Sequence, residues 1–381
     1  MAEAAALGFD LVRVTTAAPF PDTAAVLHER IAAGLYSGLP WFHHDRADVA
    51  GDPANLLPGV RSIVALGISY LTHGDPDATA PGDPHGRIAR YAWGLDYHDV
   101  FRERLRALHA FVEAQIGRPV DARLLADTAR ITDRAVAQRA GLGWYGKNSN
   151  LLTHGFGSWV LLGELLLDVD LPPDASLRTH CGACTRCMPA CPTGAIIAPG
   201  VIDNDRCISY LTIELRGPIP RELRPLVGNW IFGCDLCQEV CPVNARREPP
   251  DYAEFRPRPA VGSSPALLPL LDLTEDEFRE RFRGSPIRRA KWAGLRRNVC
   301  VALGNLRDPV AVPALTAALA AEPALVRGHA AWALGRIGGA TARAALSARA
   351  VQEPDAWVQE EIALALVELP DRSEVPGGPP R

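Results

Sequence analysis

The sequence of 381 residues lacks the features of an exported or membrane-spanning protein. No uncharged apolar run approaches the roughly 20 residues that cross a bilayer. The most apolar stretch, residues 159–167, is short and contains Glu164. The first ten residues have neither a basic start nor a long apolar core, so they do not resemble a signal peptide. We therefore expect a cytoplasmic protein.

The chain also lacks a net basic charge, since its formal net charge is -4. Any nucleic-acid partner must therefore be bound by a local basic patch. No Walker-type phosphate loop is present. The composition, 48% hydrophobic and 22% charged, is ordinary for a folded soluble protein. The length indicates two or three domains.

Cysteine is present in an informative pattern, because eight of the nine cysteines lie between positions 181 and 241. In a large chain without an export signal, such clustering favours metal ligation over disulfides. Residues 181–192 have the bacterial ferredoxin spacing, in which the fourth cysteine ligates the other of two 4Fe–4S clusters. A second motif at 234–242 lacks its first cysteine, because Ile231 stands in that position.

The ferredoxin crossing rule predicts which cysteines bind each cluster. Cluster one is predicted to use Cys181, Cys184, Cys187 and Cys241. Cluster two is predicted to use Cys191, Cys234, Cys237 and Cys207, the last being the one cysteine left in the segment. Zinc is the rival metal, and a buried free thiol is the alternative for Cys207. Cys300 lies outside the segment and is expected to be a core residue.

The hydrophobic patterns predict a first domain of mixed helices and strands over residues 1–178. Within it we expect strands near 58–70 and 158–169 and a helix over 99–117, with an irregular loop at 74–84. The cluster domain is expected at 179–246. It is followed at 247–298 by a proline-rich linker and a basic stretch.

The C-terminal residues 299–369 repeat. The sequence Val-Ala-Leu-Gly-Asn-Leu at 301–306 recurs as Trp-Ala-Leu-Gly-Arg-Ile at 332–337, and more loosely at 362–366. The first two copies begin 31 residues apart. A repeat of this length is typical of HEAT-like helical repeats. The tail at 370–381, rich in proline and glycine, is expected to be disordered.

Two short motifs near position 140 each allow two interpretations. Gly141, Gly143 and Gly146 match a dinucleotide-binding pattern, but a helical stretch precedes them, which favours a helix end over a nucleotide site. Asp133 is either the N-cap of that helical stretch or a general acid. A carboxyl donates a proton near neutral pH only if its pKa is raised, for example by burial.

The basic stretch at 279–297 contains eight arginine or lysine residues and one acid. It is either a solvated helical face or a surface that contacts phosphate groups. A basic patch beside curved repeats would suit a folded RNA, which proteins recognise by shape and by unstacked bases.

From about Pro58 to Leu369 the chain resembles the epoxyqueuosine reductases. The resemblance rests on segments 89–98, 133–137, 143–148, 157–159, 207–214, 228–234 and 297–305. It implies an α+β fold whose first domain is nitroreductase-like and holds cobalamin. The two clusters would then supply electrons to the cobalamin. The substrate would be the epoxide-bearing base at the wobble position of a tRNA anticodon, and the enzyme would be an oxidoreductase.

The resemblance also implies roles for individual residues. Asp133 would be the proton donor, and the cobalamin contacts would be Arg61, Tyr97, Asp133 and Ser158. The tRNA contacts would be Arg288, Arg289, Lys291, Arg296, Arg297 and Asn298. For Tyr97 the alternative is core packing, and for Arg61 it is a surface ion pair.

We further expect a monomer that receives electrons from an external donor such as flavodoxin or ferredoxin. Two other functions stay open. One is a reductive dehalogenase-like corrinoid enzyme that acts on a small molecule. The other is a non-enzymatic two-cluster ferredoxin fused to a helical docking scaffold.

Overall fold

The computed structural model describes residues 1–127, 129–245 and 247–369, which fall into two compact units. Unit 1 combines Met1–His73, Arg90–Cys207 and Asp235–Arg256. Unit 2 combines Gly74–Ala89, Ile208–Cys234 and the chain from Pro257 onward. The tail at 370–381, for which we predict disorder, lies outside the described residues. In the described part of the chain, no helix is long and apolar enough to cross a membrane.

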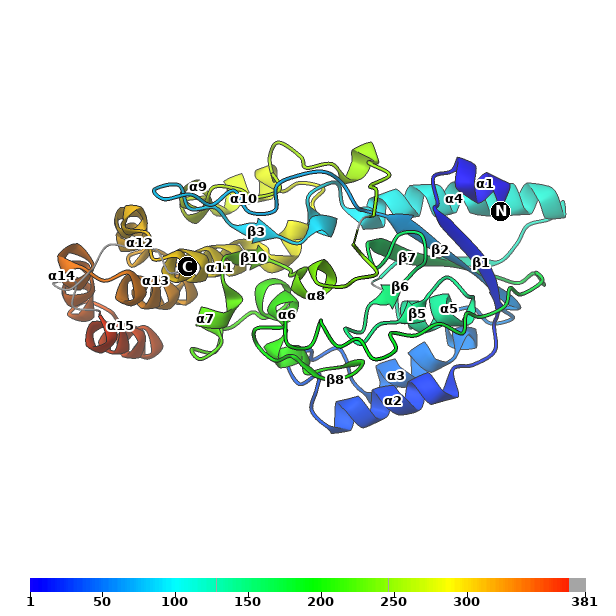
Figure 1. Cartoon of the computed structure of the whole chain (residues 1–381), viewed down its shortest axis with the longest axis horizontal. Helices are drawn as coiled ribbons and strands as arrows, with labels where there is room; N and C mark the ends of the chain where they lie inside the picture. The colour runs from blue at the N-terminus through cyan, green and yellow to red at the C-terminus, as the bar shows by residue number, and fades with distance from the viewer. Residues whose placement is uncertain (128, 246, 370–381) are drawn as a thin grey trace. The chain divides into compact units, whose positions relative to one another are not determined.

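Unit 1 contains short and long helices around one main sheet (Figure 1). Its α-helices are α1 (Ala2–Ala6), α2 (Pro21–Ala32), α3 (His44–Gly51), α4 (Tyr97–Ile116), α5 (Asp133–Arg139) and α8 (Leu236–Glu239). Its strands are β1 (Leu11–Thr16), β2 (Ser62–Ser69), β4 (Ala122–Leu125), β5 (Trp144–Tyr145), β6 (Leu151–Leu152), β7 (Val160–Leu167), β8 (Ile196–Ala198) and β9 (Val201–Ile202).

The main sheet of unit 1 has the order β1-β2-β7-β4, and every neighbouring pair is antiparallel. All residues of β2 are buried, because the strand lies inside the sheet and both of its faces are covered. The strands expected near 58–70 and 158–169 are β2 and β7, and the helix expected over 99–117 is α4. The predicted α+β class is therefore confirmed.

The two faces of this sheet belong to different hydrophobic cores. On one face Val64 and Leu165 pack with α4, and on the other Ile63 and Leu166 pack with α5. Figure 1 shows α4 and α5 on opposite sides of the strands. Helix α4 comes close to β7 at Gly163, where a Cβ atom would lie 2.5 Å from the ring of Phe101. Any side chain at 163 would force α4 away from the sheet.

Unit 2 is mainly helical. Its α-helices are α6 (Ile208–Ile213), α7 (Arg224–Val227), α9 (Leu267–Leu271), α10 (Glu275–Arg281), α11 (Lys291–Leu306), α12 (Val312–Ala318), α13 (Ala324–Ile337), α14 (Ala340–Ala350) and α15 (Ala356–Glu368). Strands β3 (Arg87–Ile88) and β10 (Trp230–Phe232) pair in parallel. The stretch expected to be an irregular loop, 74–84, belongs to this unit and contains no helix or strand.

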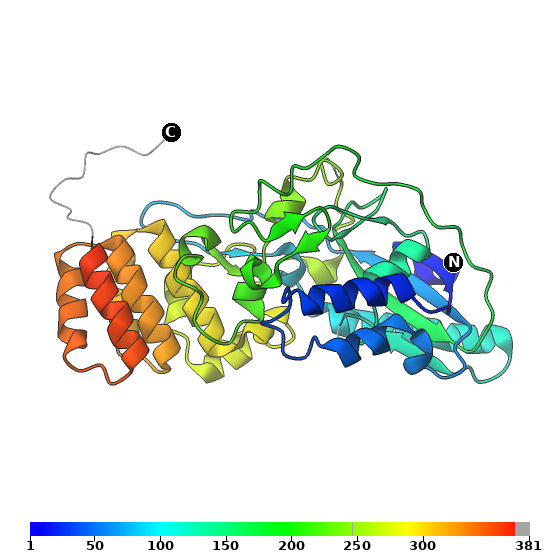
Figure 2. The same cartoon turned by 90° about the horizontal axis from the view of Figure 1, so that it is seen from below.

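The repeated Ala-Leu-Gly sequence brings successive repeat helices into close contact. A Cβ atom at Gly304 of α11 would lie 2.9 Å from Cα of Ala333 in α13. The equivalent atom at Gly335 of α13 would lie 2.9 Å from Cα of Ala365 in α15. Figure 2 shows these yellow-to-red helices side by side. The helical-repeat prediction is confirmed. The helices can approach so closely because glycine stands at the same position in two successive repeats.

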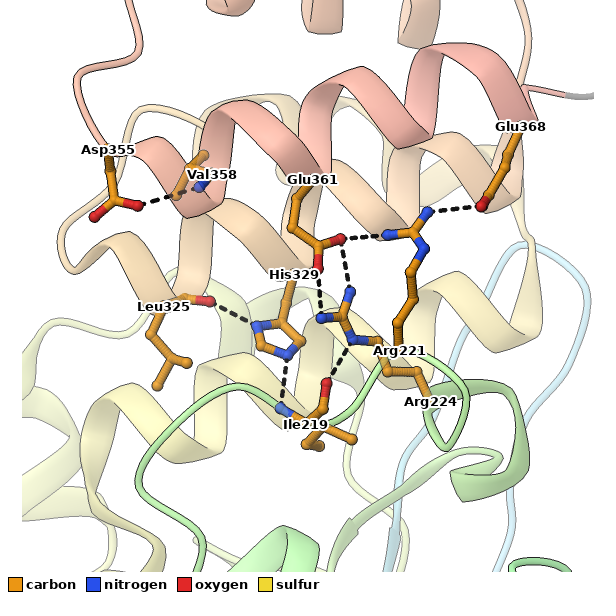
Figure 3. A network of polar contacts seen from close by, with 9 residues as sticks. All are labelled: Ile219, Arg221, Arg224, Leu325, His329, Asp355, Val358, Glu361 and Glu368. Atoms are coloured by element: carbon orange, nitrogen blue, oxygen red, sulfur yellow. Dashed lines mark hydrogen bonds and ion pairs between the residues drawn. The ribbon is translucent and has the colours of Figure 1, made fainter.

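A buried ion-pair network connects α15 to α7 within unit 2 (Figure 3). Arg224 donates two hydrogen bonds to the carboxylate of Glu361, at 2.8 and 2.6 Å. Arg221 contacts the same carboxylate and also donates to Glu368 at 2.7 Å. Cys300 in α11 is fully buried, as expected for a core residue.

Candidate functional site

The cysteines of the 181–241 segment are free thiols. All of them except Cys234 belong to unit 1, where they lie in two groups. Burial raises the pKa of the Cys187 thiol, and the neighbouring thiols Cys241, Cys181 and Cys184 raise it further. The pKa of Cys241 is raised in the same way by burial and by the nearby Cys181 and Cys184. The four cysteines assigned to cluster one therefore lie near one another, including the distant Cys241.

The second group forms around Cys237. Burial raises the pKa of this thiol to about 12, and Cys207 and Cys191 add to the effect. The amide of Asn150 lies 4.0 Å from the Cys237 sulfur. The fourth cysteine assigned to this cluster, Cys234, is the last residue of its segment in unit 2.

The donor set suits iron–sulfur clusters, because 4Fe–4S clusters are held by four thiolates. Among the described residues, no three His, Cys, Asp or Glu side chains surround the position of a single metal ion. A cubane is instead held through several irons.

Ser158 connects the start of β7 to the second cysteine motif. Its backbone N–H donates to Asn244 Oδ1 at 2.7 Å, and its hydroxyl donates to Gln238 Oε1 at 2.8 Å. The Asn244 amide donates back to the Ser158 hydroxyl at 2.8 Å. Tyr70 also donates to Gln238, at 3.2 Å. This closed network fixes the main sheet against the segment that carries Cys237 and Cys241.

Asp133 is the first residue of α5, and the N-cap of the helix is Thr132. The alternative that Asp133 caps this helix is therefore wrong. Its Oδ1 atom is buried and has no hydrogen-bond donor among the described residues. Burial raises the pKa of the Asp133 carboxyl to about 6, and the negative charge of Asp127 raises it further. This is the environment that a carboxyl needs to act as an acid near neutral pH.

Glu164 of β7 is a second buried carboxyl that the sequence analysis did not identify as functional. It is completely buried. Burial raises its pKa well above the ordinary value, and the charge of Asp133 adds to the shift. The sequence signal was the single charge within the apolar run 159–167, which we used only to argue against a membrane span.

Tyr97 and His98, at the start of α4, both contact Asp127. The Tyr97 hydroxyl donates to Asp127 at 2.7 Å, and the Tyr97 ring packs in the hydrophobic core between α4 and the main sheet. Burial lowers the pKa of His98, but its hydrogen bonds to Asp127 and Asp96 outweigh this effect and raise the pKa to about 9. Asp127 thus binds two partners from one helix and adds negative charge near Asp133.

Two other predicted features have ordinary structural explanations. Arg61 forms an ion pair with Asp170, and both side chains are more than half exposed. This is the surface pair that we kept as the alternative to a cobalamin contact. Gly141 follows α5 with a φ of 80°, which is the left-handed conformation of a residue that ends a helix. The dinucleotide interpretation of its motif is therefore wrong.

The basic stretch divides into exposed and buried residues in unit 2. Arg288, Arg289 and Lys291 are exposed, although Arg289 contacts Glu214. Arg296, Arg297 and Asn298 are instead buried. Arg297 donates to the carbonyls of Leu211, Leu215 and Gly217, and Asn298 donates to those of Thr212 and Ile231. This burial contradicts the prediction that Arg296, Arg297 and Asn298 are surface contacts for RNA. Their polar groups stabilise the packing of α11.

Several buried polar atoms near α5 have no partner within the described ranges. They are Thr132 Oγ1, Asp133 Oδ1, Trp144 Nε1 and Ser149 Oγ. Buried polar groups in native structures are nearly always hydrogen-bonded, so a cluster of exceptions indicates a place where another molecule binds. Unit 1 therefore combines seven of the eight motif cysteines with a partly unsatisfied polar site that fits a bound cofactor and substrate.

Three family models match the chain in the regions expected from its motifs. Residues 51–128 match the model described as "Epoxyqueuosine reductase QueG, DUF1730". Residues 180–244 match a 4Fe-4S double cluster binding domain. Residues 288–367 match HEAT repeats.

Relatives and solved structures match nearly the whole chain. Epoxyqueuosine reductase of Bacillus cereus is 35% identical over 373 residues, which are 97% of this chain and 96% of the relative. A solved epoxyqueuosine reductase with an epoxyqueuosine-modified tRNA-Tyr stem loop has a TM-score of 0.89 and 34% identity, over 96% of both chains. The Bacillus subtilis enzyme, solved with its catalytic aspartate loop swung out of the active site, has a TM-score of 0.89 and 34% identity. That match covers 96% of this chain and 97% of that one.

The fold and the site define the class first: the chain is an iron–sulfur oxidoreductase with a double-cluster domain and C-terminal helical repeats. Within that class, the extent and identity of the match decide the family. The chain belongs to the epoxyqueuosine reductases.

Proposed function

We propose that this chain reduces epoxyqueuosine to queuosine at the wobble position of tRNA anticodons. The observation that carries the proposal is the buried carboxyl of Asp133, whose Oδ1 has no donor among the described residues, in the same unit as seven of the eight motif cysteines. Membership of the epoxyqueuosine reductase family gives this combination its substrate.

The proposed reaction converts an epoxide into an alkene and releases its oxygen as water, which consumes two electrons and two protons. We propose that the electrons come singly from two 4Fe–4S clusters. Cys181, Cys184, Cys187 and Cys241 would bind one cluster. Cys191, Cys207, Cys234 and Cys237 would bind the other. Bound cobalamin would supply the reduced, nucleophilic cobalt that the chain itself lacks.

The protein's own side chains would position the substrate and move protons. Asp133 would donate a proton to the oxygen that leaves the epoxide, because its raised pKa keeps a proton available. Tyr97 and Ser158 would border the cobalamin site in residues 1–178. Arg61 is left out of the proposed contacts, since its guanidinium pairs with Asp170.

The tRNA would be bound through phosphate contacts. Arg288, Arg289 and Lys291 are exposed, and the repeats at 299–369 would extend their surface. A stem loop bound to a relative of similar fold supports this partner. We further propose a cytoplasmic monomer that receives electrons from flavodoxin or ferredoxin. Residues 179–246 would form its cluster domain, and 247–298 its linker and basic region.

Two binding measurements on the anaerobically reconstituted protein test this proposal against its rivals. A visible spectrum should show bound corrinoid beside the clusters, whereas a ferredoxin scaffold would bind none. An anticodon stem-loop should bind, and its affinity should fall as salt rises. A dehalogenase-like enzyme would bind corrinoid but no stem-loop. Absence of corrinoid from protein that holds both clusters would overturn the proposed function.

A further inference from the structure

Glu164 lies on the face of the main sheet that packs against α5. Along β7 it alternates with Leu162 and Leu166, both of which pack in the hydrophobic core on the α5 side. Its direct partner across the β2–β7 pair is Ala65, another residue of that core. Directly opposed residues of neighbouring strands point to the same face. The strand therefore places one carboxyl in an otherwise aliphatic surface, beneath the helix that begins with Asp133.

Three of the four oxygens of these two carboxyls have no donor from any other group in the described part of the chain. Both oxygens of Glu164 and Oδ1 of Asp133 are buried, and no N–H or O–H group among the described residues reaches them. The two carboxyls lie close enough for each to raise or lower the pKa of the other. Two ionised carboxylates are acceptors only, so a hydrogen bond between them requires a proton on one of them. Ionising both would also place two charges in a buried site without compensation.

The charged groups around the pair do not replace that proton. The positive charge of Arg134 opposes the rise in the pKa of Asp133 that burial causes, and the negative charge of Asp133 opposes the fall in the pKa of Arg46 that burial causes. Both guanidinium groups nevertheless donate their hydrogen bonds to backbone carbonyls, those of Ser149 and Ala129. The negative charge of Asp127 further raises the pKa of both carboxyls. Burial and the charge of Asp133 both raise the pKa of Tyr145, whose phenol is neutral at pH 7 because its ordinary pKa is already about 10. The surroundings therefore favour a protonated pair.

We propose that Asp133 and Glu164 share one proton at neutral pH, and that Glu164 is a positioning residue that keeps Asp133 supplied with it. The inference rests on the proposed function and deepens it. In turnover the shared proton passes along the hydrogen bond from Glu164 to Asp133, and Asp133 gives it to the leaving oxygen. Both carboxyls are then ionised, and the pair regains one proton from solvent. Glu164 never touches the substrate, so its effect is on the proton supply alone.

The raised pKa values agree with this arrangement and set the direction of its pH dependence. The pair loses its last proton only above the ordinary range of a carboxyl, because burial and mutual repulsion oppose full ionisation. An isolated Asp133, without a second carboxyl to hold a proton, would lose its proton at lower pH. Glu164 thus extends the pH range over which the acid is available.

The pH profile of a single turnover tests this role in Glu164→Gln. The amide has the same shape and can still donate to Asp133, but it carries no transferable proton. We expect the alkaline fall in rate to begin at least about one pH unit lower than in the wild type. At acidic pH the two rates should agree within about threefold, and at alkaline pH the variant should be about tenfold slower.

Two further variants and one contrary result complete the test of the role of Glu164 in proton supply. Glu164→Asp should restore part of the alkaline rate, since it keeps a carboxyl. Glu103→Gln, which removes an exposed acid of α4, should match the wild type at every pH. An equal loss at every pH in Glu164→Gln would show that Glu164 is only structural, and would overturn the inference.

Thermal unfolding of the cluster-containing protein gives a readout that needs no turnover. A carboxyl whose pKa is raised by folding stabilises the protein below its unfolded pKa, and this contribution is lost as pH rises through the folded pKa. The unfolding midpoint of the wild type should therefore fall relative to Glu164→Gln as the pH rises above the ordinary carboxyl range. A constant difference would refute the shared proton. If this shift appears while no epoxyqueuosine is reduced, the proposed function fails and the carboxyl pair stands.

Discussion

Asp133 and Glu164 acquire their properties from the positions of their backbones. Asp133 begins a helix whose N-cap is its neighbour, so its side chain is not used in capping. Glu164 occupies a strand position that faces a hydrophobic core. In water both groups would be ionised at neutral pH. Burial raises both pKa values, and the pair can then hold a proton at neutral pH.

Replacing Asp133 with asparagine tests the proposed acid. The amide keeps the shape of the side chain but cannot donate a carboxyl proton, so the rate should fall by about a hundredfold or more. The iron content and the cobalamin spectrum should not change. Asp121→Asn, which alters an exposed aspartate of unit 1, serves as the control. Normal turnover in Asp133→Asn would remove Asp133 from the mechanism.

Cys207 tests the cluster assignment. The thiol lies near Cys237 and outside both motifs, and Cys207→Ala should lower the iron content from about eight atoms per chain to about four. The matched control is Cys300→Ala, because Cys300 is a buried thiol in the helical repeats. Iron analysis and electron paramagnetic resonance would measure both variants. Full iron content in Cys207→Ala would contradict the assignment.

Residue-level prediction succeeded where a side chain has a recognisable spacing. The cysteine motifs identified groups that the structure brings together across more than fifty positions, and the resemblance identified Asp133. It failed for Arg297 and Asn298, because a count of basic residues does not show which of them face the interior. Glu164 was missed because its partner lies on another element, and only the register of β7 places the two carboxyls together.

At the scale of elements, periodicity predicted most of what the structure contains. The apolar patterns gave β2, β7, α4 and the repeat helices, because each buries at least one regular face. Helix α11 departs from this rule, since residues 294–304 are buried on all sides. Its buried arginines are explained only by the carbonyl groups of neighbouring segments, to which they donate.

The buried ion pair between α7 and α15 predicts a large stability effect (Figure 3). Glu361→Gln would leave the buried Arg224 guanidinium without a full counter-charge, which should cost about 3–5 kcal/mol of folding free energy. Glu368→Gln is the matched control. Its carboxylate is about half exposed and pairs with Arg221, so the cost should be below about 1 kcal/mol. Thermal unfolding would compare them, and equal midpoints would contradict the role given to Glu361.

At the scale of the whole molecule, two regions of the chain are each identified by a sequence pattern of their own. Cysteine spacing identifies the cluster segment, and the 31-residue recurrence identifies the repeats. The first domain has no short motif of this kind, so its cofactor and substrate followed from resemblance alone. The structure adds the unsatisfied polar atoms around α5, which no sequence pattern reveals because they come from separate segments.

The most direct measurement is product analysis of tRNA that carries epoxyqueuosine, after anaerobic incubation with reduced, cobalamin-loaded protein. We expect queuosine to appear in the nucleoside digest, and to appear only when cobalamin, reductant and both clusters are present. Unchanged epoxyqueuosine in the presence of fully loaded, reduced protein that binds the tRNA would contradict the proposed reaction.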